Sequence, residues 1–331
     1  MPAITPRELI DAILNAFQDS GASGILLSPP VKHPRKFILQ THDGAVDVWV
    51  YAWTLTHGGR PNLPDEFRIQ MTTVASPLSL NTHGFTVLLG YDPNLHVFAG
   101  FDLNRHRTFT KGSPSVQVDR NCLLRALQDG LAFDLKNNAE IAVGIRSDQL
   151  VNYIANAREL HHYGTGAKMA TLLSRASSMQ PIRKSQIVPL PGPRKRVLAI
   201  VSRLARAASF RQQVLDAYGH RCAVTRMQLR LVDAAHILPV GAPGSSDTVQ
   251  NGIALSPTFH RAFDNSLIYL DTAHVMRINP AKEQQLQTLR LDGGIVDFKS
   301  HLGRRIQLPT NSTQWPTVNL ISRANDFRRI P

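Results

Sequence analysis

The sequence predicts an α+β protein of two domains, and three observations lead to this prediction. The chain has 331 residues, which is enough for two domains of ~100–200 residues each. One amphipathic helix and a series of short apolar runs bounded by Gly, Pro and Asn fill its first half. Between residues 166 and 195 the composition becomes basic and rich in Pro and Ser. We therefore expect an N-terminal α+β domain over 1–165, a linker over 166–195 and a C-terminal domain over 196–331.

The N-terminal domain is predicted to contain a mainly antiparallel sheet. Residues 6–20 are expected to form a helix, because Leu9, Ile13 and Phe17 recur at helical spacing. Short strand-like runs separated by turn residues favour antiparallel pairing. The expected strands are 36–40, 46–53, 67–71, 85–89, 96–100 and 141–145, and further helices are expected over 122–133 and 147–160.

The C-terminal domain is predicted to combine helices with short strands. Ser256 followed by Pro257 suits the N-cap and first turn of a helix. The expected elements are a helix over 197–218, a β-hairpin-like region over 222–236, a loop over 239–246, a short helix from 257, and strands over 267–270 and 275–278.

Composition argues against several classes of protein. Hydrophobic residues make up 43% of the chain, so a packed core is expected, but no run of ~18 apolar residues predicts a membrane span. The first residues lack the basic-then-apolar plan of a signal peptide. Cys122 and Cys222 lie far apart, which argues against a disulfide scaffold or a four-cysteine zinc site. We expect a cytoplasmic protein without a membrane partner.

The charge distribution favours a polyanionic partner. The net charge is +13, and residues 181–230 hold eleven basic residues and one acidic residue, Asp216. This segment can be a linker followed by a solvated helix face, or a surface that binds along a phosphate backbone. Because His236, Asn251 and His260 follow it in the sequence, we favour nucleic acid as the partner. The candidate contacts to DNA are Arg194, Lys195, Arg196, Arg203 and Arg221, together with Arg105, Arg107 and Lys111 of a polar segment that can equally be a plain surface loop.

The residues that indicate a chemistry are His236, Asn251 and His260, separated by gaps of 15 and 9 residues. Phosphodiester hydrolysis needs a base that deprotonates water and a cation that neutralises the scissile phosphate. A histidine can act as the base at neutral pH, and a side-chain amide can fix its orientation. Taken singly, each of these residues is better explained by a core, turn or cap role, so the prediction depends on all three together.

These residues and their surroundings resemble the HNH endonuclease family, whose unit is a β-hairpin, a loop and a helix around one metal ion. The resemblance covers roughly residues 195–331 and is carried by 218–226, 232–239 and 251–264, in the manner of the restriction-endonuclease branch. It implies a ββα-metal fold in which His236 is the general base, Asn251 orients it and His260 ligates the metal. It also implies one divalent ion per site, with Mg²⁺ expected and Mn²⁺ or another transition ion as the alternatives.

Two departures from the family pattern affect the expected metal shell. Many members carry an acidic residue or histidine directly before the base, where this chain has Ala235. Asp264 lies four residues after His260 and so shares its helical face, whereas Asp233 is expected on the strand face opposite His236. We therefore prefer Asp264 over Asp233 as a second ligand; a site with one protein ligand is the alternative. Thr225 replaces the cysteine that would pair with Cys222, so we expect no structural zinc and a buried Cys222.

Target choice is expected to depend on residues 1–165. A group of aromatic residues there suits either a pocket for a flipped base or a plain core: Trp49, Tyr51, Trp53, Phe98 and Phe101. A reader domain followed by an HNH domain resembles restriction enzymes, including modification-dependent ones. The sequence thus predicts a metal-dependent DNA endonuclease of a restriction or defence system, acting on duplex DNA and as a homodimer if both strands are cut. The alternatives are a non-catalytic DNA-binding protein and a structure- or RNA-directed nuclease.

Overall fold

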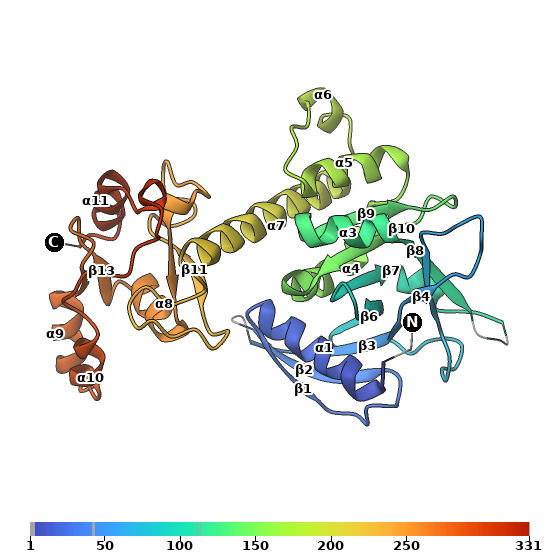
Figure 1. The fold of residues 1–331 in the computed structure, drawn as a ribbon, viewed down its shortest axis with the longest axis horizontal. Coiled ribbons are helices and arrows are strands. Elements are labelled where there is room, and N and C mark those ends of the chain that lie inside the picture. The colour runs from blue at the N-terminus through green and yellow to red at the C-terminus, as the bar shows by residue number, and fades with distance from the viewer. Residues whose placement is uncertain (1–3, 42–43, 111, 113, 331) are drawn as a thin grey trace. The chain divides into compact units, whose positions relative to one another are not determined.

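The computed structural model describes residues 4–41, 44–110, 112 and 114–330. The chain divides into two compact units, Met1–Ala208 and Ser209–Pro331, which are blue to yellow and yellow to red in Figure 1. Each unit contains its own cluster of buried apolar side chains. The α+β class predicted from the sequence is confirmed, with a mainly antiparallel sheet in the first unit.

The first unit is built around a seven-stranded sheet. Its strand order is β1-β2-β3-β6-β7-β10-β9, and the β3–β6 pair is parallel while the other described pairs are antiparallel. The strands are β1 (Ser23–Leu26), β2 (Arg35–Thr41), β3 (Gly44–Thr54), β6 (Phe85–Asp92), β7 (Val97–Phe101), β9 (Leu131–Leu135) and β10 (Ile141–Arg146). A smaller sheet has the order β4-β5-β8, with β4 (Thr56–His57), β5 (Glu66–Gln70) and β8 (Ser115–Asp119).

Both faces of the large sheet are covered by other elements. Since successive side chains of a strand point to opposite faces, neighbouring residues of one strand enter different cores. Val50 belongs to the core under helices α1 (Pro6–Asp19) and α4 (Leu150–Tyr163), whereas Tyr51 belongs to the core that β5, β8 and α3 (Arg120–Asp129) cover. Helix α1 begins at the N-cap Thr5, whose side chain forms a capping box with Glu8. The helices are α1 (Pro6–Asp19), α2 (Leu103–His106), α3 (Arg120–Asp129), η1 (Ser147–Gln149), α4 (Leu150–Tyr163), α5 (Ala167–Ser177), α6 (Lys184–Ile187) and α7 (Gly192–Ala217).

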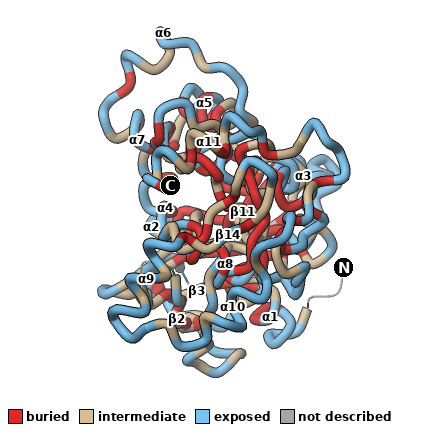
Figure 2. The backbone as a smooth tube through the Cα atoms, turned by 90° about the vertical axis from the view of Figure 1, so that its left-hand side faces the viewer, coloured by how far each residue is buried: buried red, intermediate tan, exposed pale blue. Residues whose placement is uncertain are grey.

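The segment predicted as a linker, 166–195, differs from that expectation. It contains α5, whose buried Met169, Leu172 and Leu173 join the main core, and the short helix α6, which is exposed or half-buried (Figure 2). The Ser and Pro residues indicated a linker, although Met169, Leu172 and Leu173 recur at helical spacing in the same segment. The division between the two units falls after Ala208, inside α7.

The second unit is smaller and carries short elements around one core. Strand β11 (Asp233–His236) pairs with β12 (Gly252–Leu255), so the predicted hairpin over 222–236 is wrong in its extent: residues 222–232 form turns and irregular segments, and strand begins at Asp233. The strands are β11 (Asp233–His236), β12 (Gly252–Leu255), β13 (Ile268–Leu270) and β14 (Met276–Ile278). The helices are η2 (Val249–Asn251), α8 (Pro257–Asp264), α9 (Pro280–Thr288), α10 (Ile295–Ser300), η3 (Ser312–Gln314) and α11 (Val318–Phe327).

Among the described residues, no helix is both long and apolar enough to cross a membrane.

Gly252 is predicted to be essential for packing the second unit. A Cβ atom at this position would lie 2.2 Å from Cγ2 of the buried Val214 on α7. We expect Gly252→Ala to lower the free energy of unfolding of this unit by about 1–3 kcal/mol, the usual cost of overpacking. The matched control is Gly293→Ala, because a Cβ there meets no atom within 4 Å. Hydrogen exchange of the β11 and β12 amides across a urea series measures the free energy of unfolding of each variant. Equal stability of the two variants would contradict the prediction.

His161 is predicted to make the first unit less stable at acidic pH. Its ring contacts the Tyr153 hydroxyl (Nε2, 2.9 Å) and the Ile141 carbonyl (Nδ1, 3.1 Å), and burial lowers its pKa to about 4. Below pH 6.5 His161 binds a proton in the unfolded chain, whereas in the folded chain it binds that proton only near pH 4. The free energy of unfolding therefore falls by about 1.4 kcal/mol per pH unit between these values.

The check is urea unfolding of the full chain at pH 7.5, 6 and 5, beside a His161→Gln variant. Groups other than His161 contribute to the pH dependence of both proteins, so the difference between the two isolates the histidine. We expect the variant to show the shallower loss of stability below pH 6.5. The same pH dependence in both proteins would rule His161 out as the cause.

Candidate active site

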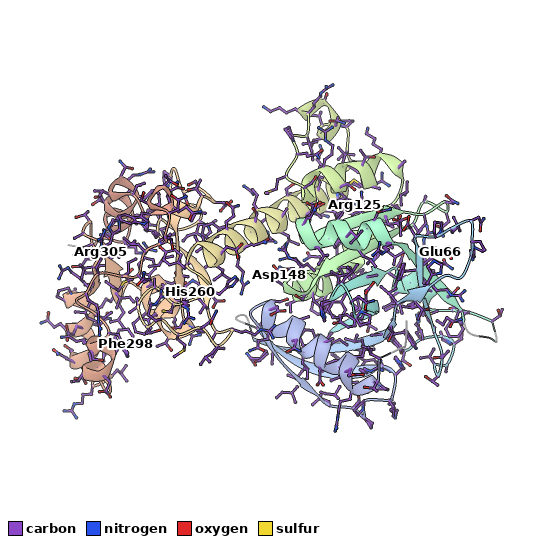
Figure 3. All side chains as sticks on the ribbon, in the orientation of Figure 1. Glu66, Arg125, Asp148, His260, Phe298 and Arg305 are labelled. Atoms are coloured by element: carbon purple, nitrogen blue, oxygen red, sulfur yellow. The ribbon has the colours of Figure 1, made fainter. Side chains whose placement is uncertain are left out.

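Two short strands, the 3-10 turn before the second of them and one helix carry the predicted site residues. In the antiparallel pairing of β11 and β12, His236 lies opposite Gly252 and Asp233 lies opposite Leu255. Ser256 occupies the N-cap of α8, so this helix begins directly after β12. The helix consequently brings His260 next to the start of β11, with 3.8 Å between its Nδ1 and Oδ2 of Asp233. Figure 3 labels His260 among the side chains of the second unit.

The imidazole of His236 is held by contacts on its face and at its edge. The ring stacks on Phe210, with 3.8 Å between centroids and 14° between planes. At the edge, Nε2 lies 3.0 Å from Oδ1 of Asp247. The backbone carbonyls of His236 and Ile237 both accept hydrogen bonds from the guanidinium of Arg328. The side chain remains 18% exposed, so water can reach it.

Asn251 is fully buried and acts on the chain next to His236. Its Oδ1 accepts from the Leu238 amide (2.8 Å), and its Nδ2 donates to the carbonyls of Leu238 (3.1 Å) and Ser246 (2.9 Å). Its own carbonyl accepts from the Ile237 amide at 2.9 Å. Sequence reasoning assigned Asn251 to orient His236. The structure places its amide on the loop after β11, while Asp247 and Phe210 contact the ring.

His260 is flanked by both of the carboxylates that were considered as metal ligands. Its Nε2 lies 3.4 Å from Oδ2 of Asp264, and its Nδ1 faces Asp233, which also pairs with Arg211 at 3.9 Å. The hydrogen bond that His260 donates to Asp233 raises the pKa of His260, burial lowers it, and the charge of Asp264 raises it further. Asp233, expected to point away from His236, thus faces the second histidine.

Ala235 is buried and belongs to the core of the second unit. Since successive side chains on a strand alternate, Ala235 points to the face opposite His236 and contributes no ligand. Among the described residues, no group of three or more His, Cys, Asp and Glu side chains is arranged to hold a metal ion. His260 with either neighbouring carboxylate still offers imidazole nitrogen and carboxylate oxygen, which fit an ion that keeps several waters.

Sequence reasoning missed two residues of the site, Asp247 and Phe210. Asp247 is the one acidic residue between His236 and Asn251, and that isolated position is the signal that could have found it. Phe210 looked like any apolar position of the long helix α7. Cys222 is buried, as expected, and its Sγ accepts a hydrogen bond from the Thr225 amide at 3.5 Å.

The basic residues proposed for DNA contact differ in their environment. In the first unit Lys195, Arg196 and Arg203 are exposed on α7, whereas Arg194 donates to the Thr165 carbonyl at 3.4 Å. Arg107 donates to the Leu78 carbonyl at 3.0 Å, and Arg105 pairs with Asp102 at 3.7 Å. Arg221 is exposed in the second unit. Lys111 lies outside the described residues.

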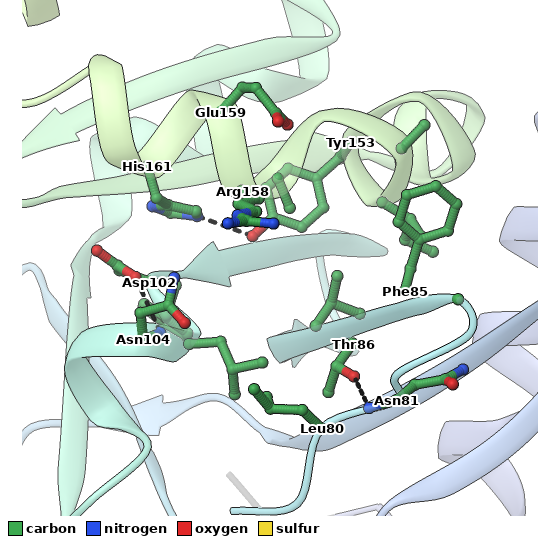
Figure 4. A pocket seen from close by; sticks show the side chains of 17 residues that line it. Leu80, Asn81, Phe85, Thr86, Asp102, Asn104, Tyr153, Arg158, Glu159 and His161 are labelled. Carbon is green, nitrogen blue, oxygen red and sulfur yellow. Dashed lines mark hydrogen bonds between the residues drawn. The ribbon is translucent and has the colours of Figure 1, made fainter.

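The aromatic residues of the first unit lie mostly in its cores. Tyr51, Phe98 and Phe101 are at most 2% exposed, and Phe98 lies on the sheet face opposite Tyr51. A pocket of about 470 Å³ lies between α4, the start of β6 and the β7–α2 junction, and Phe101 is part of its lining (Figure 4). Its polar lining includes Asp102, Asn104, Arg158 and Glu159.

Comparison with known families and structures identifies two segments. Residues 222–271 match the family described as HNH endonuclease, and residues 46–154 match the family described as Methylase-associated X1. A solved structure described as "Modification dependent TagI restriction endonuclease" is similar at 14% identity, over 87% of this chain and 82% of that chain, with a TM-score of 0.29. No curated protein matches. His236, Asn251 and His260 all lie inside the first matched segment, and the second unit of this chain therefore contains an HNH endonuclease domain.

Proposed function

We propose that the protein is a metal-dependent DNA endonuclease of a restriction or defence system. The observation that carries the proposal is the position of two histidines in an HNH domain. One, His236, is held by a stacked ring and a carboxylate, and the other, His260, is flanked by two carboxylates. This arrangement supplies a base and a metal-binding group on adjoining elements, which is what phosphodiester hydrolysis requires.

Each site residue has a distinct role in the proposed reaction. His236 accepts the proton of the attacking water. His260, with Asp264 or Asp233, would hold the divalent ion, and that ion supplies positive charge next to the scissile phosphate. Nucleases of this family generally depend on a divalent metal, and we propose Mg²⁺, with Mn²⁺ or another transition ion as alternatives. Asn251 keeps the loop after β11 in place.

The nature of the substrate is proposed from charge and from the matched families. A net charge of +13 favours binding to a phosphate backbone. A nuclease segment and a segment described as methylase-associated occur in one chain, which supports a restriction role. We propose duplex DNA as substrate and the cytoplasm as the location. If one chain carries one site, cutting both strands requires two chains, so a homodimer is the expected form during cleavage.

His236→Ala is predicted to abolish most cleavage while DNA binding survives. The loss of a general base costs roughly 10²–10⁴-fold in rate. Nicking of supercoiled plasmid with Mg²⁺ or Mn²⁺ measures the rate, and a gel-shift assay measures binding. His220→Ala is the control, because His220 is exposed, pairs with Asp216 and lies outside the matched residues 222–271. Unchanged cleavage by the His236 variant would remove this residue from the mechanism.

The same experiment tests a non-catalytic alternative, which the buried Ala235 favours. A wild-type protein that binds plasmid without nicking it, at any divalent ion tried, would be a DNA-binding protein that retains the HNH fold. Cleavage of RNA or single strands in preference to duplex DNA would instead indicate a structure- or RNA-directed nuclease. Parallel digestion of methylated and unmethylated genomic DNA, with sequencing of the ends, determines whether base modification is required.

Asp264→Asn and Asp233→Asn are predicted to differ in the metal concentration that they require. Replacing a carboxylate that binds the ion weakens metal activation, by about 10–100-fold if its contribution is like that of a supporting ligand. We expect Asp264→Asn to need the higher Mg²⁺ or Mn²⁺ concentration. The nicking rate across a metal titration measures this. A larger shift for Asp233→Asn would assign the second ligand to the strand.

A further inference from the structure

The loop between β11 and η2 holds Asp247 in place beside His236. On one side of Asp247, the carbonyl of Ser246 accepts from Nδ2 of the buried Asn251 at 2.9 Å. On the other side, the carbonyl of Thr248 accepts from the Asn251 amide at 2.9 Å. The Ser246 and Thr248 hydroxyls also lie 3.0 Å apart. The backbone on either side of Asp247 is therefore anchored to one buried residue, so the carboxylate is not on a loose surface loop.

The contact between Asp247 and His236 determines which ring nitrogen carries the hydrogen. An ionised carboxylate only accepts hydrogen bonds, so Nε2 of His236, at 3.0 Å from Oδ1, must be the donor. In the neutral ring the other nitrogen, Nδ1, is then the one that can accept a proton. The Phe210 ring, stacked at 3.8 Å, restricts tilting of the imidazole, and the hydrogen bond restricts its rotation. One tautomer in one orientation follows from these two contacts.

We propose that Asp247 is the positioning residue of His236, which fixes its Nδ1 as the atom that takes the proton of the attacking water. The inference rests on the proposed nuclease function and adds to it a residue that acts through the base. Asp247 takes the role that sequence reasoning gave to Asn251, and Asn251 in turn secures the loop that carries Asp247.

The step that Asp247 assists is the deprotonation of water. An O–H bond of the water breaks and its proton passes to Nδ1 of His236, while an oxygen lone pair forms the new bond to phosphorus. The bond from phosphorus to the leaving oxygen breaks, and that oxygen takes a proton from solvent water. The imidazolium that results lies beside the Asp247 carboxylate, and a charge-assisted hydrogen bond stabilises it. Asp247 touches neither the phosphate nor the attacking water.

The first test is plasmid nicking by Asp247→Asn and Asp247→Glu. We expect Asp247→Asn to lower kcat by roughly 10–100-fold with little change in KM for DNA, and Asp247→Glu to recover part of the loss. The matched control is Asp216→Asn, because Asp216 forms a second Asp–His pair in the same unit, also at 3.0 Å, with the exposed His220. Both Asn variants remove one negative charge, so a general effect of charge on DNA binding would appear in both.

The second test separates positioning from a structural role. In a His236→Ala background, Asp247→Asn should cause no further loss of cleavage, because its effect passes through the missing ring. A loss of the same size in both backgrounds would overturn the inference, as would wild-type activity of Asp247→Asn beside an inactive His236→Ala. The latter result would leave the nuclease proposal intact.

A third readout does not depend on activity. ¹⁵N NMR of the full chain with labelled histidine reports the tautomer of His236. The signals of this residue are assigned as those that disappear in His236→Ala. We expect the Nε2–H form in the wild type and a shift toward the Nδ1–H form in Asp247→Ala. An Nδ1–H tautomer in the wild type would overturn the inference. If the protein proves unable to cut DNA, this measurement still decides the role of Asp247, so the two proposals fail separately.

Discussion

The site depends above all on the antiparallel register of two four-residue strands. Because His236 faces Gly252, the base lies beside a residue without a side chain, and the close approach of Val214 from α7 leaves room for nothing larger. Because Leu255 ends β12 opposite Asp233, helix α8 must start there and His260 comes next to that carboxylate. A shift of one residue would turn the side chains of His236 and Asp233 to the other faces of the strand pair and would separate Asp233 from His260. The geometry thus follows from a small number of backbone hydrogen bonds.

A buried amide supports this register. Asn251 satisfies its polar atoms on the backbone of the loop that follows β11, and unpaired buried groups of this kind would cost stability. The same residue therefore serves the fold and, through Asp247, the orientation of the base. Placing both tasks on one side chain explains why an asparagine, which both donates and accepts, suits this position better than a serine or an aspartate.

Some of this could be predicted from the sequence. The spacing of His236, Asn251 and His260 identified the domain, and the periodic apolar residues located α1, α4 and α7, since these signals are local. The position of Asp247 as the one acidic residue between His236 and Asn251 was a signal in the sequence, but its contact with His236 could not be predicted, because that contact depends on how a Gly- and Ser-rich loop folds back. The contact of Asp233 with His260 and the helix α5 were missed for different reasons: the contact depends on where α8 places His260, and Ser and Pro residues near α5 indicated a linker.

Helix α7 contributes its early turns to the core of the first unit and its last turns to the core of the second unit. Its early turns bury Val197, Val201 and Leu204 in the first core, and its last turns bury Phe210, Val214 and Leu215 in the second. A nuclease module cut at the start of the family match, Cys222, would lose the ring that stacks on His236. In evolution or in protein engineering, an exchange of the N-terminal unit must therefore join the two parts within this helix, before Ser209, and not in the loop that follows it.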